Sequence, residues 1–178
     1  LKPAYADAYY NRGLTYNQLF HHYSKPFSAE VTEKYNNAIA DFDKVLELDP
    51  TYVLAYAGKG NAYYRNGEFD NATAEFDKAL DSMALILEQS EGKGLAGVYG
   101  SRARNYKEML EVNKSSSDYE QAIALDPKLM IALSHHASNY AMIGEYEEAV
   151  KTYDAEVDIL ENDPDYKDYA WGYYTYKG

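Results

Sequence analysis

The chain repeats itself along its length, and this repetition limits the folds open to it more than any other feature of the sequence. Residues 53–60 carry side chains of similar types to those of residues 6–13 at most positions, in the same order. Residues 72–76 resemble residues 38–42 in the same way. Leu48-Asp-Pro50 likewise returns as Leu125-Asp-Pro127. Each repeat of this kind forms one small structural unit, and each unit packs on its neighbours. The sequence therefore predicts an extended stack of similar units.

Each unit carries two stripes of aromatic and small residues with helical spacing. Within residues 53–86, Tyr56, Gly60 and Tyr63 stand at i, i+4 and i+7, which places them on one face of a helix. A turn signal at Asn66-Gly67 follows this helix. Each unit is therefore predicted to be a helical hairpin, and eleven of the 21 Tyr residues, Tyr146 and Tyr153 among them, are predicted to pack helix on helix. The second stripe of this unit consists of Ala72, Phe76 and Ala79.

Counted from Val53, these residues with Gly67 occupy places 4, 8, 11, 15, 20, 24 and 27 of the unit. This pattern resembles the tetratricopeptide repeat, in which aromatic and small residues of a first helix pack against Ala and aromatic residues of a second. Four such units follow one another, at 6–52 with an insert at 17–34, at 53–86, at 96–129 and at 130–163. The resemblance covers most of the chain and implies an all-α fold, a right-handed α-solenoid of four helical hairpins forming one array over residues 1–178.

Three segments lie between or beyond the regular parts of these units. Residues 87–95 are predicted to be a hinge, and Ser28 is the predicted N-cap of the helix that follows the first insert. Residues 164–178 are interpreted as a partial repeat or a capping helix. Because Leu1-Lys-Pro3 matches Leu48-Asp-Pro50, the phrase that closes a unit, we expect the array to continue upstream.

Composition and local motifs disfavour several classes of function. The chain has no Cys, which excludes thiolate nucleophiles, disulfides and Cys-based zinc sites. Its formal net charge of −12 opposes binding to nucleic acid, and no apolar run approaches the roughly 20 residues that insertion across a membrane requires. The compartment stays open, with a slight preference for the cytoplasm.

No motif points to a cofactor, a metal or catalysis. Residues 92–97 match the glycine spacing of a dinucleotide-binding motif. The strand that such a motif requires before it is not predicted here, so the match does not indicate nucleotide binding. The pairs His21-His22 and His135-His136 each point about 100° apart on a helix, which disfavours chelation of one ion. Since no nucleophile and base stand together in the sequence, we expect neither a cofactor nor enzymatic activity.

The acidity of the chain is concentrated in the second helices of the hairpins. These segments (29–48, 68–90, 118–126 and 145–161) carry −3, −5, −3 and −6, or −17 together, whereas the first helices (6–18, 53–67, 96–112 and 130–143) carry 0, +2, +1 and 0. In the tetratricopeptide fold the first helices line a concave groove and the second helices face outward. The resemblance therefore implies a groove that is not acidic and an acidic back, whose charges we expect to be solvated.

Candidate binding residues follow from the face of each first helix that points away from its second helix. Arg65, Arg104 and Lys107 are predicted to engage an acidic or carboxylate-bearing peptide, and the alternative is that these cations pair with Glu108 or Glu111. Gly58, Gly97 and Gly100 lie on or near the same face, which suggests close approach of a ligand. The complete set of predicted partner-binding residues is Tyr10, Leu14, Asn61, Tyr64, Arg65, Arg104, Lys107, His135 and Ser138.

These patterns predict a non-enzymatic protein–protein interaction scaffold that binds a peptide or partner segment in the groove. One tetratricopeptide subfamily holds the C-terminal carboxylates of chaperones, but Tyr10, Leu14, Gly58, Gly97 and Ser101 fill its binding places here, so that specific function is not expected. The alternative is a structural or docking segment of a larger multidomain protein or self-assembling array, which associates through the Tyr-rich and Trp-containing segment 169–176.

Overall fold

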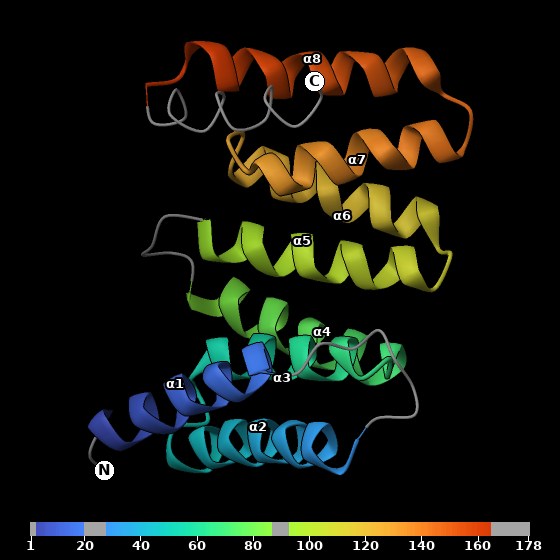
Figure 1. Ribbon diagram of the computed structural model, residues 1–178. Coiled ribbons are helices and arrows are strands. Elements are labelled where there is room, and N and C mark those ends of the chain that lie inside the picture. The colour runs from blue at the N-terminus through green and yellow to red at the C-terminus, as the bar shows by residue number, and fades with distance from the viewer. Residues whose placement is uncertain (1–2, 20–27, 87–92, 165–178) are drawn as a thin grey trace.

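The computed structural model describes residues 3–19, 28–86 and 93–164, and these residues form eight α-helices without any strand. The helices are paired in sequence order into four hairpins, so the all-α prediction is confirmed (Figure 1). They are α1 (Pro3–Leu19), α2 (Ala29–Leu48), α3 (Val53–Arg65), α4 (Phe69–Ile86), α5 (Lys93–Glu108), α6 (Val112–Leu125), α7 (Met130–Met142) and α8 (Tyr146–Asn162).

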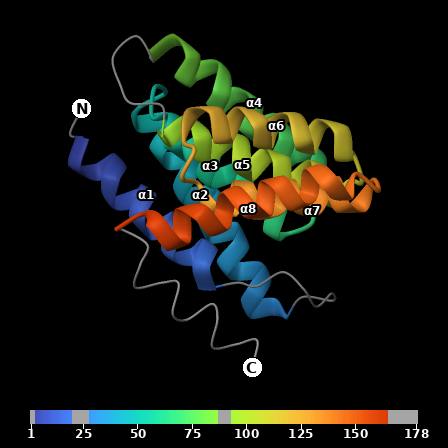
Figure 2. The same ribbon diagram turned by 90° about the horizontal axis from the view of Figure 1, so that it is seen from above.

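The hairpins stack one on the next to form an α-solenoid. The second helix of each hairpin packs on the first helix of the following one, as α2 does on α3, α4 on α5 and α6 on α7. The first helices α1, α3, α5 and α7 also contact one another in series. Figure 2 looks along the stack and shows that successive hairpins are rotated, with α1 and α2 at a large angle to α7 and α8. The first helices therefore share one side of the stack.

The boundaries of the helices follow local signals in the sequence. Ser28 caps α2 as predicted, because its Oγ accepts a hydrogen bond from the Val31 amide at 3.3 Å. Helix α5 begins at Lys93, so residues 93–95 of the expected hinge are helical instead. The other residues of the hinge, the pair His21-His22 and the expected C-terminal helix with Trp171 lie outside the described residues.

Close packing of aromatic rings on glycine joins the helices of the first hairpins. Phe42 is fully buried, and its ring lies against Gly13 of its own hairpin and against Gly58 of the next. Gly58 thus serves the packing of helices, which corrects the expectation that a ligand approaches it. Gly97 is open, since nothing beyond its chain neighbours and the backbone of its own helix lies within 4 Å of where its Cβ would stand. Gly100 has only ordinary contact with Leu129 at 3.9 Å.

The fourth hairpin departs from this packing. Tyr153 occupies the place that Phe42 and Tyr119 occupy in their hairpins, yet it is 41% exposed and Tyr146 is 69% exposed. No helix within residues 3–164 follows α8, so its outer side has no described partner. The prediction that these two Tyr pack helix on helix is therefore wrong.

Two buried amides fasten neighbouring hairpins to each other at equivalent places. Asn105 of α5 donates through Nδ2 to the Phe69 carbonyl at 2.9 Å and to Thr73 Oγ1 at 2.8 Å, both in α4. Asn139 of α7 donates in the same way to Ser115 Oγ of α6 at 2.8 Å. Because both amides are fully buried, these bonds fix the registers of α5 on α4 and of α7 on α6.

Candidate functional site

Four polar side chains from α5 and α7 gather on the side of the first helices, and we call them the groove cluster: Arg104, Lys107, His135 and Ser138. Lys107 Nζ donates a hydrogen bond to Ser138 Oγ at 2.9 Å, which links the two helices. The guanidinium carbon of Arg104 lies 4.9 Å from the centre of the Tyr64 ring. The His135 ring is stacked on Tyr119 with 5.9 Å between centroids. These aromatic supports hold the cationic and polar groups in place.

The groove cluster is positively charged and partly removed from water. Burial lowers the pKa of Lys107, although Glu108 opposes the shift. Burial likewise lowers the pKa of His135, and the charges of Lys107 and Arg104 lower it further. Both shifts indicate that the site lacks enough negative charge to compensate its cations.

The described residues do not show the alternative in which Arg104 and Lys107 pair with Glu108 or Glu111. Glu111 forms its ion pair with Lys114, at 2.6 Å between Nζ and Oε2. No carboxylate within residues 93–164 lies in ion-pair distance of Arg104 or Lys107, and Arg104 Nε is buried without a hydrogen-bond partner. A ligand carboxylate would therefore meet donors that no described acidic side chain occupies.

A small cavity of about 70 Å³ adjoins the cluster between α5 and α7. The side chain of Arg104 forms part of its wall, and Gly97 and Gly100, which have no side chains, keep the surface of α5 low beside it. The cavity also has an apolar portion formed by Leu129 and Ile131. The arrangement can accommodate a small apolar group next to a negatively charged one.

The remaining predicted residues do not converge with the groove cluster, with one exception. Tyr10 packs into the first core, 5.1 Å from Tyr52 between ring centroids, and Leu14 packs against the same core. Asn61 donates to the Ala57 carbonyl of its own helix at 3.1 Å, and Arg65 is half-buried at the end of α3. Tyr64 is the exception, since it is 6% exposed and acts as the platform beneath Arg104 instead of an open aromatic surface.

Ion pairs between the helices are a feature that the sequence analysis missed. Arg12 of α1 donates to both carboxylate oxygens of Asp41 in α2, at 2.7 and 2.6 Å. Arg102 of α5 holds both oxygens of Asp118 in α6 at 2.7 Å and also donates to Asp77 of α4 at 2.6 Å. Although burial lowers the pKa of Arg102, these carboxylates raise it above its ordinary value. Part of the acidity of the second helices is thus matched by cations and is not simply solvated.

The same place in the second hairpin holds Lys59, which lies 2.7 Å from Asp43 and 3.6 Å from Glu75. Lys59 and Arg102 therefore each join their own second helix to that of the preceding hairpin. The signal was present in the sequence. A basic residue stands one place before the Gly or Ala at place 8, and acidic residues stand on both sides of the aromatic at place 24. In the fourth hairpin the basic place is taken by His136, 3.8 Å from Glu120.

Neither a metal-binding cluster nor a membrane-spanning helix is found among the described residues. Among them, no group of three or more His, Cys, Asp or Glu is arranged to hold a metal ion. None of the helices in the described ranges has the length and apolar character needed to cross a membrane.

The fold defines a class, the helical-hairpin solenoids whose first helices lie in series along one side. Comparison with known families makes the assignment specific. A model described as TPR repeat matches residues 32–67, and a model described as Tetratricopeptide repeat matches residues 53–82. These matches identify tetratricopeptide repeats within residues 32–82, and the structure shows helical hairpins of the same kind on either side of them.

One curated relative and several solved structures are similar to the chain. Human Tetratricopeptide repeat protein 13 is 26% identical over 130 residues, which cover 73% of this chain and only 14% of the relative's length. A crystal structure of MamA superposes with a TM-score of 0.70 at 22% identity, covering 90% of this chain and 81% of that one. The first TPR of Spaghetti (RPAP3), bound to HSP90 peptide SRMEEVD, has a TM-score of 0.62 at 17% identity, covering 81% of this chain and 97% of that one. At these identities the solved structures bear on the fold alone.

Proposed function

We propose that the chain is a non-enzymatic protein-interaction scaffold that binds a peptide segment carrying a carboxylate on the side formed by its first helices. The observation that carries the proposal is the groove cluster, in which two cations from α5 have no carboxylate partner among the described residues. A carboxylate placed there would accept charge-assisted hydrogen bonds from Arg104 and Lys107, each worth about 1.5–3 kcal/mol.

The electrostatics of the cluster favour an anionic ligand over a neutral one. Burial lowers the pKa of Lys107, so its charged form is less stable there than in water. A bound carboxylate would compensate this loss and restore the charged form. The ligand would supply the negative charge that Asp118 supplies to Arg102 inside the protein.

The fold class is compatible with this use. A structure of the same fold holds a peptide whose sequence, SRMEEVD, contains three acidic residues. The places used by the chaperone-binding subfamily are filled differently in this chain, and we therefore propose the chemical class of the peptide and not that particular ligand.

The proposal can be tested by selecting peptides that bind the 178-residue chain from a random display library. The affinity of each selected peptide is then measured by calorimetry. We expect enrichment of Asp, Glu or a free C-terminus. The double variant Arg104→Gln/Lys107→Gln should weaken binding at least about tenfold while circular dichroism stays unchanged. Lys34→Gln/Lys44→Gln on α2 removes the same charge from the back and should leave affinity unchanged. Equal affinity of the groove variant and the wild type would contradict the proposal.

A further inference from the structure

The junction between the third and fourth hairpins breaks the pattern of ion pairs on the back of the solenoid. His136 stands at the place held by Lys59 and Arg102 in their hairpins, and Thr152 stands at the place held by Asp118. The acidic residue that the preceding hairpin contributes is retained at this junction, as Glu120 of α6. A shorter basic residue and a neutral one thus replace the long cation and its acid.

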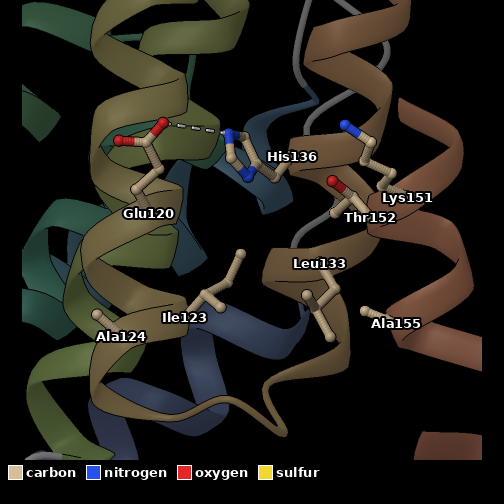
Figure 3. A pocket seen from close by; sticks show the side chains of 8 residues that line it. All are labelled: Glu120, Ile123, Ala124, Leu133, His136, Lys151, Thr152 and Ala155. Atoms are coloured by element: carbon tan, nitrogen blue, oxygen red, sulfur yellow. Dashed lines mark ion pairs between the residues drawn. The ribbon is translucent and has the colours of Figure 1, made fainter. Parts of the chain in front are cut away.

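A cavity of about 400 Å³ opens where these side chains are missing, between α6, α7 and α8 (Figure 3). Ile123 and Leu133 form apolar walls, and Glu120 and His136 face one another across the upper part of the cavity in Figure 3. Its volume lies in the range of about 300–1,000 Å³ that is typical of ligand pockets. The groove cluster lies elsewhere, on the first-helix side of α7 around His135, so this cavity is a separate site.

Of the two polar groups that face each other at the cavity, His136 is buried without a partner, whereas Glu120 is more than half exposed. His136 is only 5% exposed, and its Nε2 has no hydrogen-bond partner. The nearest acidic oxygen, Glu120 Oε1, lies 3.8 Å away, too far for a hydrogen bond. A buried imidazole nitrogen without a partner is costly, and a donor placed between it and the carboxylate would satisfy both groups.

We propose that this cavity binds the side chain of an arginine or lysine from a partner protein, with the aliphatic stem on Ile123 and Leu133 and the cation between Glu120 and His136. The occupant would restore from outside the contact that Arg102 makes within the chain to Asp118 and Asp77. A neutral apolar side chain would contact the walls but leave the buried imidazole without a partner and the Glu120 carboxylate without a counter-charge.

The charges around His136 agree with a cationic occupant. The groups that face it are Glu120 and Tyr119 from α6, Tyr140 from α7 and Lys151 from the cavity wall on α8. Lys151 is already paired with Glu148, which reduces its repulsion of a second cation. Burial lowers the pKa of His136, although Glu120 opposes the shift, and this favours the neutral imidazole, whose unprotonated ring nitrogen can accept a hydrogen bond.

The test uses three capped amino acids as probes: acetyl-arginine amide, acetyl-lysine amide and acetyl-norleucine amide. Their binding to the 178-residue chain is followed by NMR shifts of backbone amides in α6, α7 and α8 and of the His136 ring. We expect saturable shifts with both cations, and affinity at least about tenfold lower for norleucine, which has the stem without the charge. A bound cation should also lower the pKa of the His136 ring, because it disfavours a second positive charge. Shifts without saturation, or equal affinity for norleucine, would overturn the proposal.

Two variants separate this site from a general effect on folding. Glu120→Gln should abolish the preference for the cations while norleucine still binds, and Glu147→Gln, exposed on α8, should behave as wild type. His136→Arg/Thr152→Asp rebuilds the internal ion pair and should exclude all three probes while raising the melting temperature. Retained cation preference in Glu120→Gln would contradict the proposal. Peptide binding at the groove cluster is expected to be unaffected by any of these changes, so failure here leaves that function standing.

Discussion

The ring of Phe42 in α2 lies so close to Gly58 of α3 that a Cβ atom on Gly58 would stand 2.6 Å from Cε1 of the ring. The two residues belong to different hairpins, and the ring also touches Gly13 of its own hairpin. A single buried aromatic therefore joins three helices, and this contact depends on glycine at both positions.

Gly58→Ala should destabilise the fold by about 1–3 kcal/mol, because the added methyl group must displace a fully buried ring. Gly97→Ala is the matched control, since it also lies inside a first helix but has open space around it. That change should be neutral or stabilising by up to about 1 kcal/mol, through helix propensity. Urea unfolding of both variants measures the difference, and equal stabilities would contradict the packing role of Gly58.

The turn of the third hairpin contains a strained residue. Leu110 has a φ of +61°, in the place where Gly67 and Gly144 have φ values of +75° and +85°. Its side chain is 78% exposed, so little packing would be lost on removing it. Leu110→Gly should therefore stabilise the protein by about 1 kcal/mol, whereas Gly144→Ala should cost a similar amount. Thermal unfolding monitored by circular dichroism would show the opposite shifts; two shifts of the same sign would be inconsistent with strain at Leu110.

Arg102 is predicted to be the most sensitive of the inter-helix cations. Asp118 is only 5% exposed, so Arg102→Met leaves a buried carboxylate without a counter-charge. The variant should lower the free energy of unfolding by about 3 kcal/mol. Lys44→Met removes an exposed cation from α2 whose partner Glu47 is also exposed, and it should have little effect. Adding Asp118→Leu to Arg102→Met should recover stability, because no buried charge then remains. A double variant less stable than Arg102→Met would argue against this explanation.

The repetition in the sequence was sufficient to predict the hairpins, because the same pairing of two helices occurs in each of the four repeats. What repetition could not provide is the contact between one unit and the next. The Phe42 ring reaches Gly58 across a junction, and a stripe on a single helix does not reveal that partner. The same limitation placed Tyr153 in the core, because its place in the unit is buried only where neighbouring helices cover it.

The candidate site was predictable where adjacent first helices carry polar residues on the same face, as with Lys107 and Ser138. Tyr64 could not be separated from an exposed groove residue by spacing alone, because Arg104 of the next hairpin lies against it and helps to bury it. The charges of the second helices were assigned to solvent because net charge per helix ignores pairing across helices. Comparing equivalent places between repeats would have found the partners, and it isolates His136 as the exception.

Glu156 of α8 provides a prediction about pH. It is 7% exposed, and burial raises the pKa of its carboxyl group, although a hydrogen bond with Ser134 opposes the shift. A raised pKa in the folded state means that the folded protein binds more protons than the unfolded chain above about pH 4.5, so this group lowers stability as pH rises through that window.

Glu156→Gln keeps the hydrogen-bonding capacity and removes the charge. It should therefore be more stable than wild type at pH 7, with the advantage declining as pH falls toward 4.5. Glu147→Gln, on the exposed face of the same helix, should show no such advantage. Urea unfolding at several pH values measures this, and an advantage of Glu156→Gln that grew on acidification would have the wrong sign for a buried carboxylate.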